Sequence, residues 1–449
     1  MLTHDEAMHL IDAALRHSPA DQTEIVLSFT EQGLTRLANG GIHQHMAMAN
    51  GEARVRAVLG TRVGVATSNR LTAESVRELV DQAVAIARVS EPNPECAVLP
   101  TPETAEYAGL AGAVPTPILE VALDALTPER RADVAAVLVQ TAQGNGVTAA
   151  GHVASALSAL AVGNSHGVRA YHRWPSCGIM AIMTQPGASG YADWAGTDLS
   201  TAPAAEIAAR ACRKCLASQG ATTVAPGAYT VILEPPAVAE MLAMLAYIGL
   251  GATAFQEGRS FMSDRVGETL VGDNISLRDD TYHPGMLTMP FDFEGTPKRV
   301  VPFFTHGVAR GVVHDTATAR KAGVASTGHA LPAPNPAGPL PMHLVLDTGD
   351  QTMDSLIGGV ERGILVTRFH YVNIVHPKET TLTGMTRDGT FLIEDGSLTH
   401  AVQNMRFTQS ILAALSQVTG IERHQTSINQ EGLYCLAPAL RIAQFTFTS

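Results

Sequence analysis

The chain is 449 residues long, more than the roughly 250 to 300 residues at which a single hydrophobic core stops growing, so we expect two domains. Hydrophobic residues make up 45% of the sequence and charged residues 16%, a composition that excludes a disordered chain. The formal charge is -12, and no run of Lys or Arg could neutralise a series of phosphates. We therefore expect no nucleic-acid partner.

The sequence lacks the features of export and membrane insertion. No basic region followed by an apolar segment opens it, and no stretch of about 18 apolar residues occurs. The sequence predicts a cytoplasmic protein without a membrane contact, in which the five cysteines are reduced thiols. Cys212 and Cys215 fall within a run of helical composition, and we expect them on a helix surface rather than in a metal or redox site.

The first part of the chain predicts helices around an antiparallel sheet. Residues 3–16 carry one apolar stripe, and Thr3 followed by Glu6 has the spacing of a capping box. Half-alternating runs indicate short strands at residues 24–29, 34–38, 42–48, 54–59 and 63–66. Gly33 is expected to separate the first two of these strands, and residues 72–89 predict a second amphipathic helix.

The same pattern recurs and then changes near residue 220. Residues 127–143 and 204–218 predict helices, with strand-like runs between them. We expect residues 1–220 to form an α+β domain whose antiparallel sheet is flanked by helices. Residues 221–449 are expected to form a β-rich domain with a central apolar helix at 236–249.

Two short motifs could indicate either a functional site or a turn, and we expect a turn at both positions. Residues 163–167 read Gly-Asn-Ser-His-Gly, which fits the nucleophile elbow Gly-x-Ser-x-Gly, but they lie between two strand-like runs rather than before a helix. Asp388 and Gly389 stand between two apolar runs and predict a hairpin turn. No phosphate-binding or dinucleotide-binding glycine motif occurs, which disfavours those enzyme classes.

Several sequence blocks are spread along the chain, at residues 34–40, 42–44, 60–69, 254–261, 266–268, 363–369 with Asn373, 383–390, 404–407 and 437–440. Together these blocks resemble the TldD/PmbA family, also known as modulators of DNA gyrase, and within it the TldE-like members. Blocks that keep the family's order are more specific than any one short motif. The resemblance implies an N-terminal α+β domain, a β-rich C-terminal domain, and pairing of a TldD-type chain with a TldE-type chain to enclose a cleft.

The family's zinc ligands are missing at the matching positions. TldD-type chains carry His-Glu-x-x-x-His on the central helix and a cysteine further on, which suits zinc and its activated water. Here residues 236–249 contain Glu240 and no histidine, and Cys435 does not match the position of the family's thiol. The resemblance therefore implies a metal-free, non-catalytic partner subunit, with zinc in the partner chain. Its implied substrates are unfolded or small peptides, or amide bonds of modified compounds.

Six residues in the family blocks are candidates for the substrate or partner cleft: Phe255, Glu257, Arg259, Arg368, Asn373 and Arg387. Arg259 could grip a carboxylate with both guanidinium arms, or could form a local ion pair with Glu257 across a tight turn. Residues 369–372 are expected to form an edge strand to which a peptide could add its backbone.

Two other functions remain open from the sequence. One is a self-sufficient hydrolase with an unusual site built from histidines such as His43, His45 or His370. The other is a binding module that modulates another protein without hydrolysis. Stoichiometric metal in the isolated chain would support the first.

Overall fold

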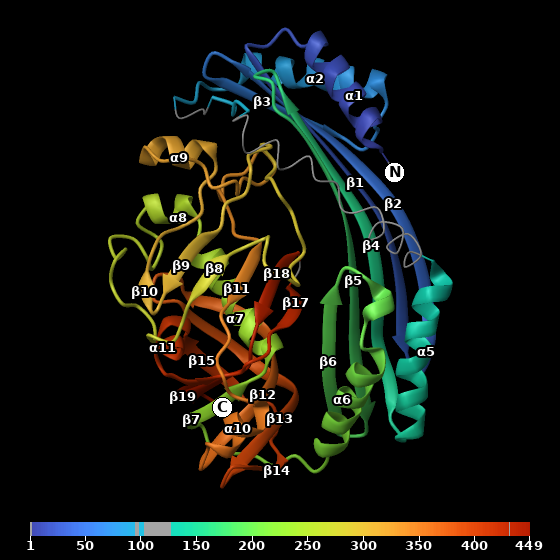
Figure 1. The fold of residues 1–449 in the computed structure, drawn as a ribbon, viewed down its shortest axis with the longest axis vertical. Helices are drawn as coiled ribbons and strands as arrows, with labels where there is room; N and C mark the ends of the chain where they lie inside the picture. Colours follow the sequence, from blue (N-terminus) through green and yellow to red (C-terminus); the bar gives the residue numbers. More distant parts are fainter. Residues whose placement is uncertain (1, 95–97, 103–126, 431) are drawn as a thin grey trace.

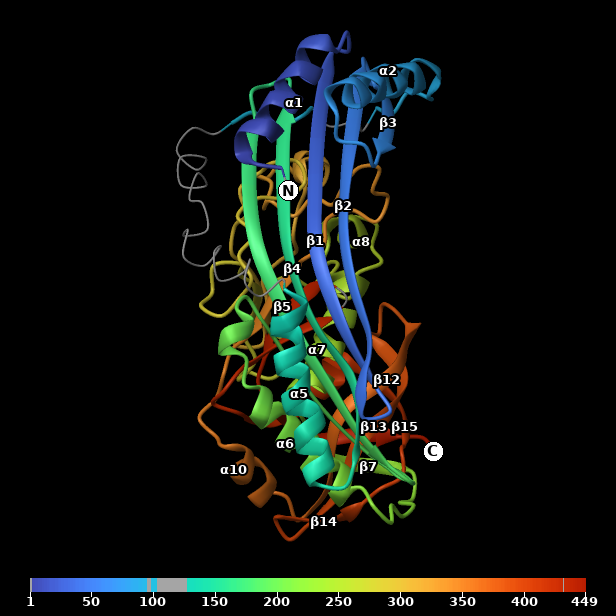
Figure 2. The same cartoon turned by 90° about the vertical axis from the view of Figure 1, so that its right-hand side faces the viewer.

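The computed structural model describes residues 2–94, 98–102, 127–430 and 432–449. An arched sheet from the first part of the chain stands beside a β-rich second part, as the sequence predicts (Figure 1). Figure 2 shows the long strands running side by side along the molecule, with α1 and α2 at one end and α5 and α6 toward the other. Among the described residues, no helix combines the length and apolar character needed to cross a bilayer.

The first sheet is antiparallel, with strand order β3-β2-β1-β4-β5-β6. Its strands are β1 (Gln22–Ala38), β2 (Gly41–Leu59), β3 (Arg62–Ser68), β4 (Thr148–Asn164), β5 (Arg169–Gln185) and β6 (Ala188–Gly196). The helices are α1 (His4–His17), α2 (Ala73–Val89), α5 (Pro128–Gly144) and α6 (Ala204–Ala217), with a 3-10 turn, η1, at Leu199–Thr201. Because β3 pairs only with Ala53 to Leu59, the start of β2 forms an open edge.

Alternation along the strands assigns the two faces of this sheet. Ile25 and Leu27 of β1 pack in one cluster with α1 and α2, whereas Val26 packs with Phe291 of the second part. Successive strand residues point to opposite faces, so one face carries the helices and the other faces the second part of the chain. Thr3 caps α1 through a capping box with Glu6, as predicted.

Gly33 does not break the first strand, contrary to the prediction. It lies inside the continuous strand β1, and a Cβ at this position would lie 2.1 Å from the guanidinium carbon of Arg131. The buried Arg131 side chain comes from α5 and donates to the Ser155 hydroxyl. Gly33 is therefore required for close approach of a side chain, not for a turn.

The cysteine predictions have a mixed outcome. Cys177, Cys212, Cys215 and Cys435 are free and buried, while Cys96 lies outside the described residues. Cys212 and Cys215 belong to α6 but face the core beneath it, so the expectation of a helix surface is wrong. Three residues apart, they occupy the buried stripe together with Ala208 and Ala211.

The second part contains an open sheet and a closed ring of strands, and a central helix packs against both. The open sheet has the strand order β10-β9-β8-β11-β18-β17. The other strands follow the order β12-β7-β19-β15-β13-β14. Because β12 also pairs with β13, these strands close into a ring. The sheet strands are β8 (Leu277–Asp279), β9 (Val301–Thr305), β10 (Val308–Ala309), β11 (His343–Leu346), β17 (Thr426–Gln430) and β18 (Leu433–Ala437). The other strands are β7 (Gly227–Leu233), β12 (Arg362–His376), β13 (Thr381–Glu394), β14 (Ser397–Ala401), β15 (Arg406–Ser410), β16 (Val418–Ile421) and β19 (Leu440–Phe447).

The central helix α7 (Pro235–Gly249) packs in one core with residues of both strand systems. Short helices complete this part: α8 (Ala252–Gln256), α9 (Thr316–Ala322), α10 (Met353–Gly358) and α11 (Ile411–Ser416). The predicted hairpin turn at Asp388 and Gly389 is wrong, because both residues lie within β13, with φ of 53° and 127°. The ladder with β12 shifts register nearby, between Val366 and Arg368, so these positive φ angles belong to a strand irregularity.

The turn prediction for residues 163–167 is confirmed. β4 ends at Asn164 and β5 begins at Arg169, so no helix follows the serine. The Asn164 side-chain oxygen accepts hydrogen bonds from the backbone N–H groups of His166 and Val168, and the Ser165 hydroxyl accepts from the Thr23 N–H. Ser165 is a structural turn residue in this fold.

Candidate functional site

A groove runs along the exposed side of α7. This helix starts with Pro235, whose fixed φ suits the first helical position, and continues through good helix formers. From Ala237 onward its residues are buried except for Glu240, Ala243, Met244 and Tyr247. The spacing of three, one and three residues places these four on one face of the helix.

The rest of the groove lining comes from β12, from the segment just before β11, and from the adjoining ends of β17 and β18. The groove has a volume of about 640 Å³, and it is lined by Glu240, Ala243, Met244, Tyr247, Leu340, Met342, Tyr371, Val372, Asn373, Ile374, Gln430 and Leu433. Most of this lining is apolar or aromatic. Tyr247 and Tyr371 are 69% and 79% exposed, so both rings are accessible to a binding partner.

The part of β12 beside the groove has an open edge. β7 pairs with β12 only from Gly363 to Val366, and no other described strand continues the ladder on that side. Beyond that point β12 keeps β13 on its other side, with a register shift between His370 and Asn373 and a φ of 53° at Tyr371. Unpaired N–H and C=O groups at such an edge can pair with an extended peptide.

The described lining of the groove contains no set of zinc ligands. Among the described residues, Glu240 is the one carboxylate in this lining, and no histidine or cysteine is part of it. In the described ranges of the chain, no group of three or more His, Cys, Asp or Glu side chains is placed to hold a metal ion. His43 and His45 lie exposed on β2, where His45 makes a hydrogen bond of 2.8 Å with the Thr35 hydroxyl. The described lining is mostly apolar with few polar groups, as in typical ligand-binding clefts.

The structure does not bring the six predicted cleft residues into one site. Only Asn373 lines the groove, where its amide donates a 2.9 Å hydrogen bond to the Tyr371 carbonyl. Phe255 packs against the core from α8. Glu257 and Arg259 form an exposed ion pair across Gly258, which matches the local-turn alternative. Sequence reasoning missed Tyr247 and Tyr371, which only their exposure in the fold identifies.

Arg368 and Arg387 lie at a contact between the ring and the arched sheet. The Arg368 guanidinium donates through Nε to Asp388, at 2.9 Å, and its carbon lies 4.5 Å from the centre of the Tyr191 ring. The Ser189 hydroxyl donates to the other Asp388 oxygen at 2.6 Å, so β6 and β13 share this carboxylate. Arg387 lies 3.8 Å from Asp388 and is more exposed. Arg368 thus links the ring to the arched sheet through the Tyr191 ring and the shared Asp388 carboxylate.

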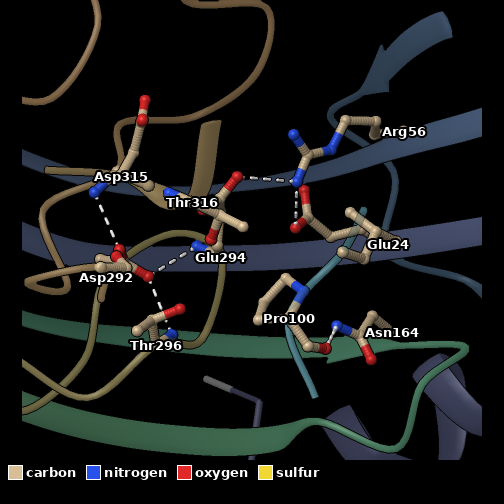
Figure 3. Close-up of polar contacts among 12 residues, drawn as sticks. Glu24, Arg56, Pro100, Asn164, Asp292, Glu294, Thr296, Asp315 and Thr316 are labelled. Carbon is tan, nitrogen blue, oxygen red and sulfur yellow. Dashed lines mark hydrogen bonds and ion pairs between the residues drawn. The ribbon is translucent and has the colours of Figure 1, made fainter. Parts of the chain in front are cut away.

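A second polar contact joins the arched sheet to the loop after β8. Arg56 of β2 donates one Nη2 to Glu24 of β1 at 2.7 Å and to Glu294 at 3.1 Å (Figure 3). All three side chains are largely buried. Burial, with Glu294 acting in the same direction and Arg56 opposing it, raises the pKa of Glu24 to about 7. One guanidinium therefore faces two carboxylates, and the pKa of Glu24 is shifted toward its protonated form.

Known structures share the fold of the whole chain, including the arched sheet. The crystal structure of TldE from Thermococcus kodakarensis aligns with a TM-score of 0.82 and 20% identity, covering 99% of this chain and 100% of that one. At this identity the likeness concerns the fold. Models of the PmbA/TldA metallopeptidase C-terminal domain and of domain 1 match residues 226–449 and 23–87. The chain belongs to the PmbA/TldD family of metalloprotease-like proteins.

Curated relatives share sequence over part of their length. A metalloprotease of Methanothermobacter thermautotrophicus is 22% identical over 48% of this chain and 47% of its own. A metalloprotease TldD homolog of Haemophilus influenzae is 23% identical over 47% of this chain and 44% of its own. The aligned regions thus span less than half of the length of each of these relatives.

Proposed function

We propose that this chain is the metal-free partner subunit of a two-chain TldD/TldE-type metallopeptidase, and that its α7 groove completes the substrate cleft. The observation that carries this proposal is the exposed face of α7. The resemblance places the zinc motif of TldD-type chains on the corresponding helix, whereas here that face presents Glu240, Ala243, Met244 and Tyr247. In this proposal zinc and its activated water belong to the partner chain.

The residues present do not fit zinc on this helix. Zinc requires imidazole, thiolate or carboxylate groups arranged around one point, and the described residues of the groove lining offer a single carboxylate, Glu240. We therefore assign no catalytic step to this chain. Its contribution is to bind and orient a peptide, which raises the effective concentration of the scissile bond at the partner's metal.

The groove supports peptide binding through its backbone and its rings. An extended peptide can pair with the open edge of β12, which gives affinity without dependence on sequence. The Tyr247 and Tyr371 rings can contact its side chains. Such a mode suits the substrates implied by the family, namely unfolded or small peptides and modified peptidic compounds.

The test is peptide or amide cleavage by this chain, by a TldD-type partner, and by the mixture, with zinc measured in each sample. We expect cleavage only in the mixture, with zinc confined to the partner. Stoichiometric zinc and cleavage in this chain alone would overturn the proposal.

A pair of matched variants tests the groove itself. Tyr247→Arg places a bulky cation in the groove at an exposed position, and Val324→Arg makes the same addition at an exposed position that does not line it. We expect Tyr247→Arg to lower kcat/KM of the mixture at least about tenfold, equal to ~1.4 kcal/mol, while Val324→Arg leaves it unchanged. Equal activity of both variants would show that the groove does not contact the substrate.

A further inference from the structure

A second, smaller pocket adjoins the α7 groove. Its volume is about 230 Å³, and Leu340 and Met342 line both the pocket and the groove. Trp174 of β5 and Tyr434 of β18 contribute aromatic surface, so residues of both parts of the chain enclose it. This volume is below the range typical of drug-sized ligands, so it suits a smaller molecule with few polar groups.

Among the described residues that line this pocket, Lys298 has the only cationic side chain, and it is just 6% exposed. Asp279 and Asp292 attract its ammonium electrostatically, but no described residue accepts a hydrogen bond from Nζ. Burial lowers the pKa of Lys298, and the two carboxylates oppose that shift. A buried ammonium has three N–H donors, and leaving them without acceptors is costly.

The two neighbouring carboxylates accept hydrogen bonds from donors other than Lys298. Oδ2 of Asp279 accepts from the N–H groups of Met342 and His343, both at 2.9 Å, and its Oδ1 lies 3.0 Å from His329. Asp292 accepts from three further backbone N–H groups, those of Glu294, Thr296 and Ala330. These backbone donors hold both carboxylates in place.

His343 provides a second polar atom without a partner. Its side chain lines the pocket and is 1% exposed, and in the described part of the chain its Nδ1 makes no hydrogen bond. Burial, with a smaller contribution from Lys298, lowers the pKa of His343 to about 3, so the imidazole is neutral at physiological pH. Its ring stacks on Tyr434, with centroids 6.3 Å apart.

The charges around Lys298 select the kind of ligand. Burial raises the pKa of Asp292 to about 8 even beside Lys298, so this site disfavours the ionised form of a further carboxylate on a ligand. A cationic ligand would be repelled by Lys298 itself. A neutral carbonyl oxygen can accept from Nζ without adding charge, and an amide N–H could in turn donate to a neutral imidazole nitrogen.

We propose that this pocket binds a small neutral amide with an apolar body, whose carbonyl oxygen accepts from Lys298 and whose apolar part packs against Trp174 and Tyr434. The site is separate from the α7 groove, and its occupancy does not depend on the peptidase assignment. A free acid of the same shape is excluded by charge, and water alone would leave the aromatic surface without a partner.

The experiment compares two probes that differ in one group, N-acetyl-leucine amide and N-acetyl-leucine. Binding to the full chain is measured at neutral pH by ligand-observed NMR titration. We expect saturable binding of the amide, and binding of the acid that is at least tenfold weaker. The absence of saturable amide binding would show that the pocket holds only water, and equal binding of both probes would also overturn the proposal.

Two variants locate the binding in the pocket. Lys298→Met removes the ammonium and is expected to weaken amide binding at least tenfold, provided that circular dichroism shows a folded protein. Leu331→Phe adds volume to the apolar lining without touching the charges, and we expect the same loss. If Lys298→Met fails to fold, the Leu331→Phe variant and the comparison of the two probes test the proposal. Unchanged amide binding by Leu331→Phe would place the ligand elsewhere and overturn the proposal.

Discussion

Two of the arginine contacts between the arched sheet and the second part of the chain differ in charge balance. Arg56 faces two carboxylates, Glu24 and Glu294, and the side chains are 15%, 4% and 8% exposed. Arg368 faces one carboxylate, Asp388, and is 22% exposed. The first contact thus has an excess of buried negative charge, and the second does not.

This difference shows how similar residues can have different physical roles. The Arg56 contact depends on pH, because one of its carboxylates takes up a proton near neutrality. The Arg368 contact is balanced at neutral pH, and it lies on β12, the strand whose later residues line the groove. We expect the first contact to control stability and the second to control the alignment of the two parts.

The largest effect is expected from Arg56→Met. The variant leaves two buried carboxylates without their counter-charge, which typically costs about 3 to 5 kcal/mol. Urea unfolding at pH 8 measures the loss. Arg70→Met is the matched control, because Arg70 is 73% exposed and its ion pair with Glu78 is long, at 3.9 Å, so its loss is expected to stay below about 1 kcal/mol. Equal losses would contradict the buried character of the Arg56 contact.

A pH effect of intermediate size is expected from Glu24. Its pKa is raised to about 7, so the folded state favours the protonated form. The stabilisation is complete below the unfolded pKa near 4.5 and is lost as the pH rises through about 7, on the order of 3 kcal/mol in total. Glu24→Gln should remove this loss. Chemical unfolding of both proteins from pH 5 to 8 checks it, and parallel pH curves would refute the assignment.

A smaller effect is expected from Arg368→Met. Asp388, which is 6% exposed, loses a charge-assisted hydrogen bond but keeps the Ser189 hydroxyl, so we expect a loss of about 2 kcal/mol in the free energy of unfolding. Arg387→Met serves as the control, because Arg387 lies 3.8 Å from the same carboxylate and is 46% exposed. A loss for Arg387→Met as large as that for Arg368→Met would break the distinction between the two arginines.

The smallest effect is expected from Arg259→Ala. Its ion pair with Glu257 is exposed and local, and such pairs contribute about 0 to 1 kcal/mol. Neither the unfolding free energy nor peptide cleavage by the assembled pair should change measurably. A fall in kcat/KM with unchanged stability would instead favour the two-pronged grip of a substrate carboxylate.

Local features of the fold could be predicted from the sequence, and long-range ones could not. The capping box of Thr3 and Glu6 and the apolar central helix follow from spacing and composition alone. Gly33 was misread because its reason lies in Arg131, a residue of a distant helix. Asp388 and Gly389 have the residue types of a turn, but pairing with β12 keeps them within a strand.

The candidate site shows the same limit. Asn373 was found through the family blocks, whereas Tyr247 and Tyr371 carry no motif and become visible only when α7 and β12 lie together. Arg56 and Glu294 are 238 residues apart in the chain, so no local pattern links them. The missing histidines of the central helix were the one functional signal that the sequence provided without the fold.

The position of β7 within the ring has a consequence for synthesis. β7 forms ladders with β12 on one side and with β19 on the other. During translation β7 emerges about 200 residues before β19, at a rate of roughly 5 to 20 residues per second, so it waits ten seconds or more for its second neighbour. Over this interval its apolar residues Val231, Ile232 and Leu233 lack their final cover. Nascent chains of this protein are therefore expected to need chaperones more than the finished molecule does.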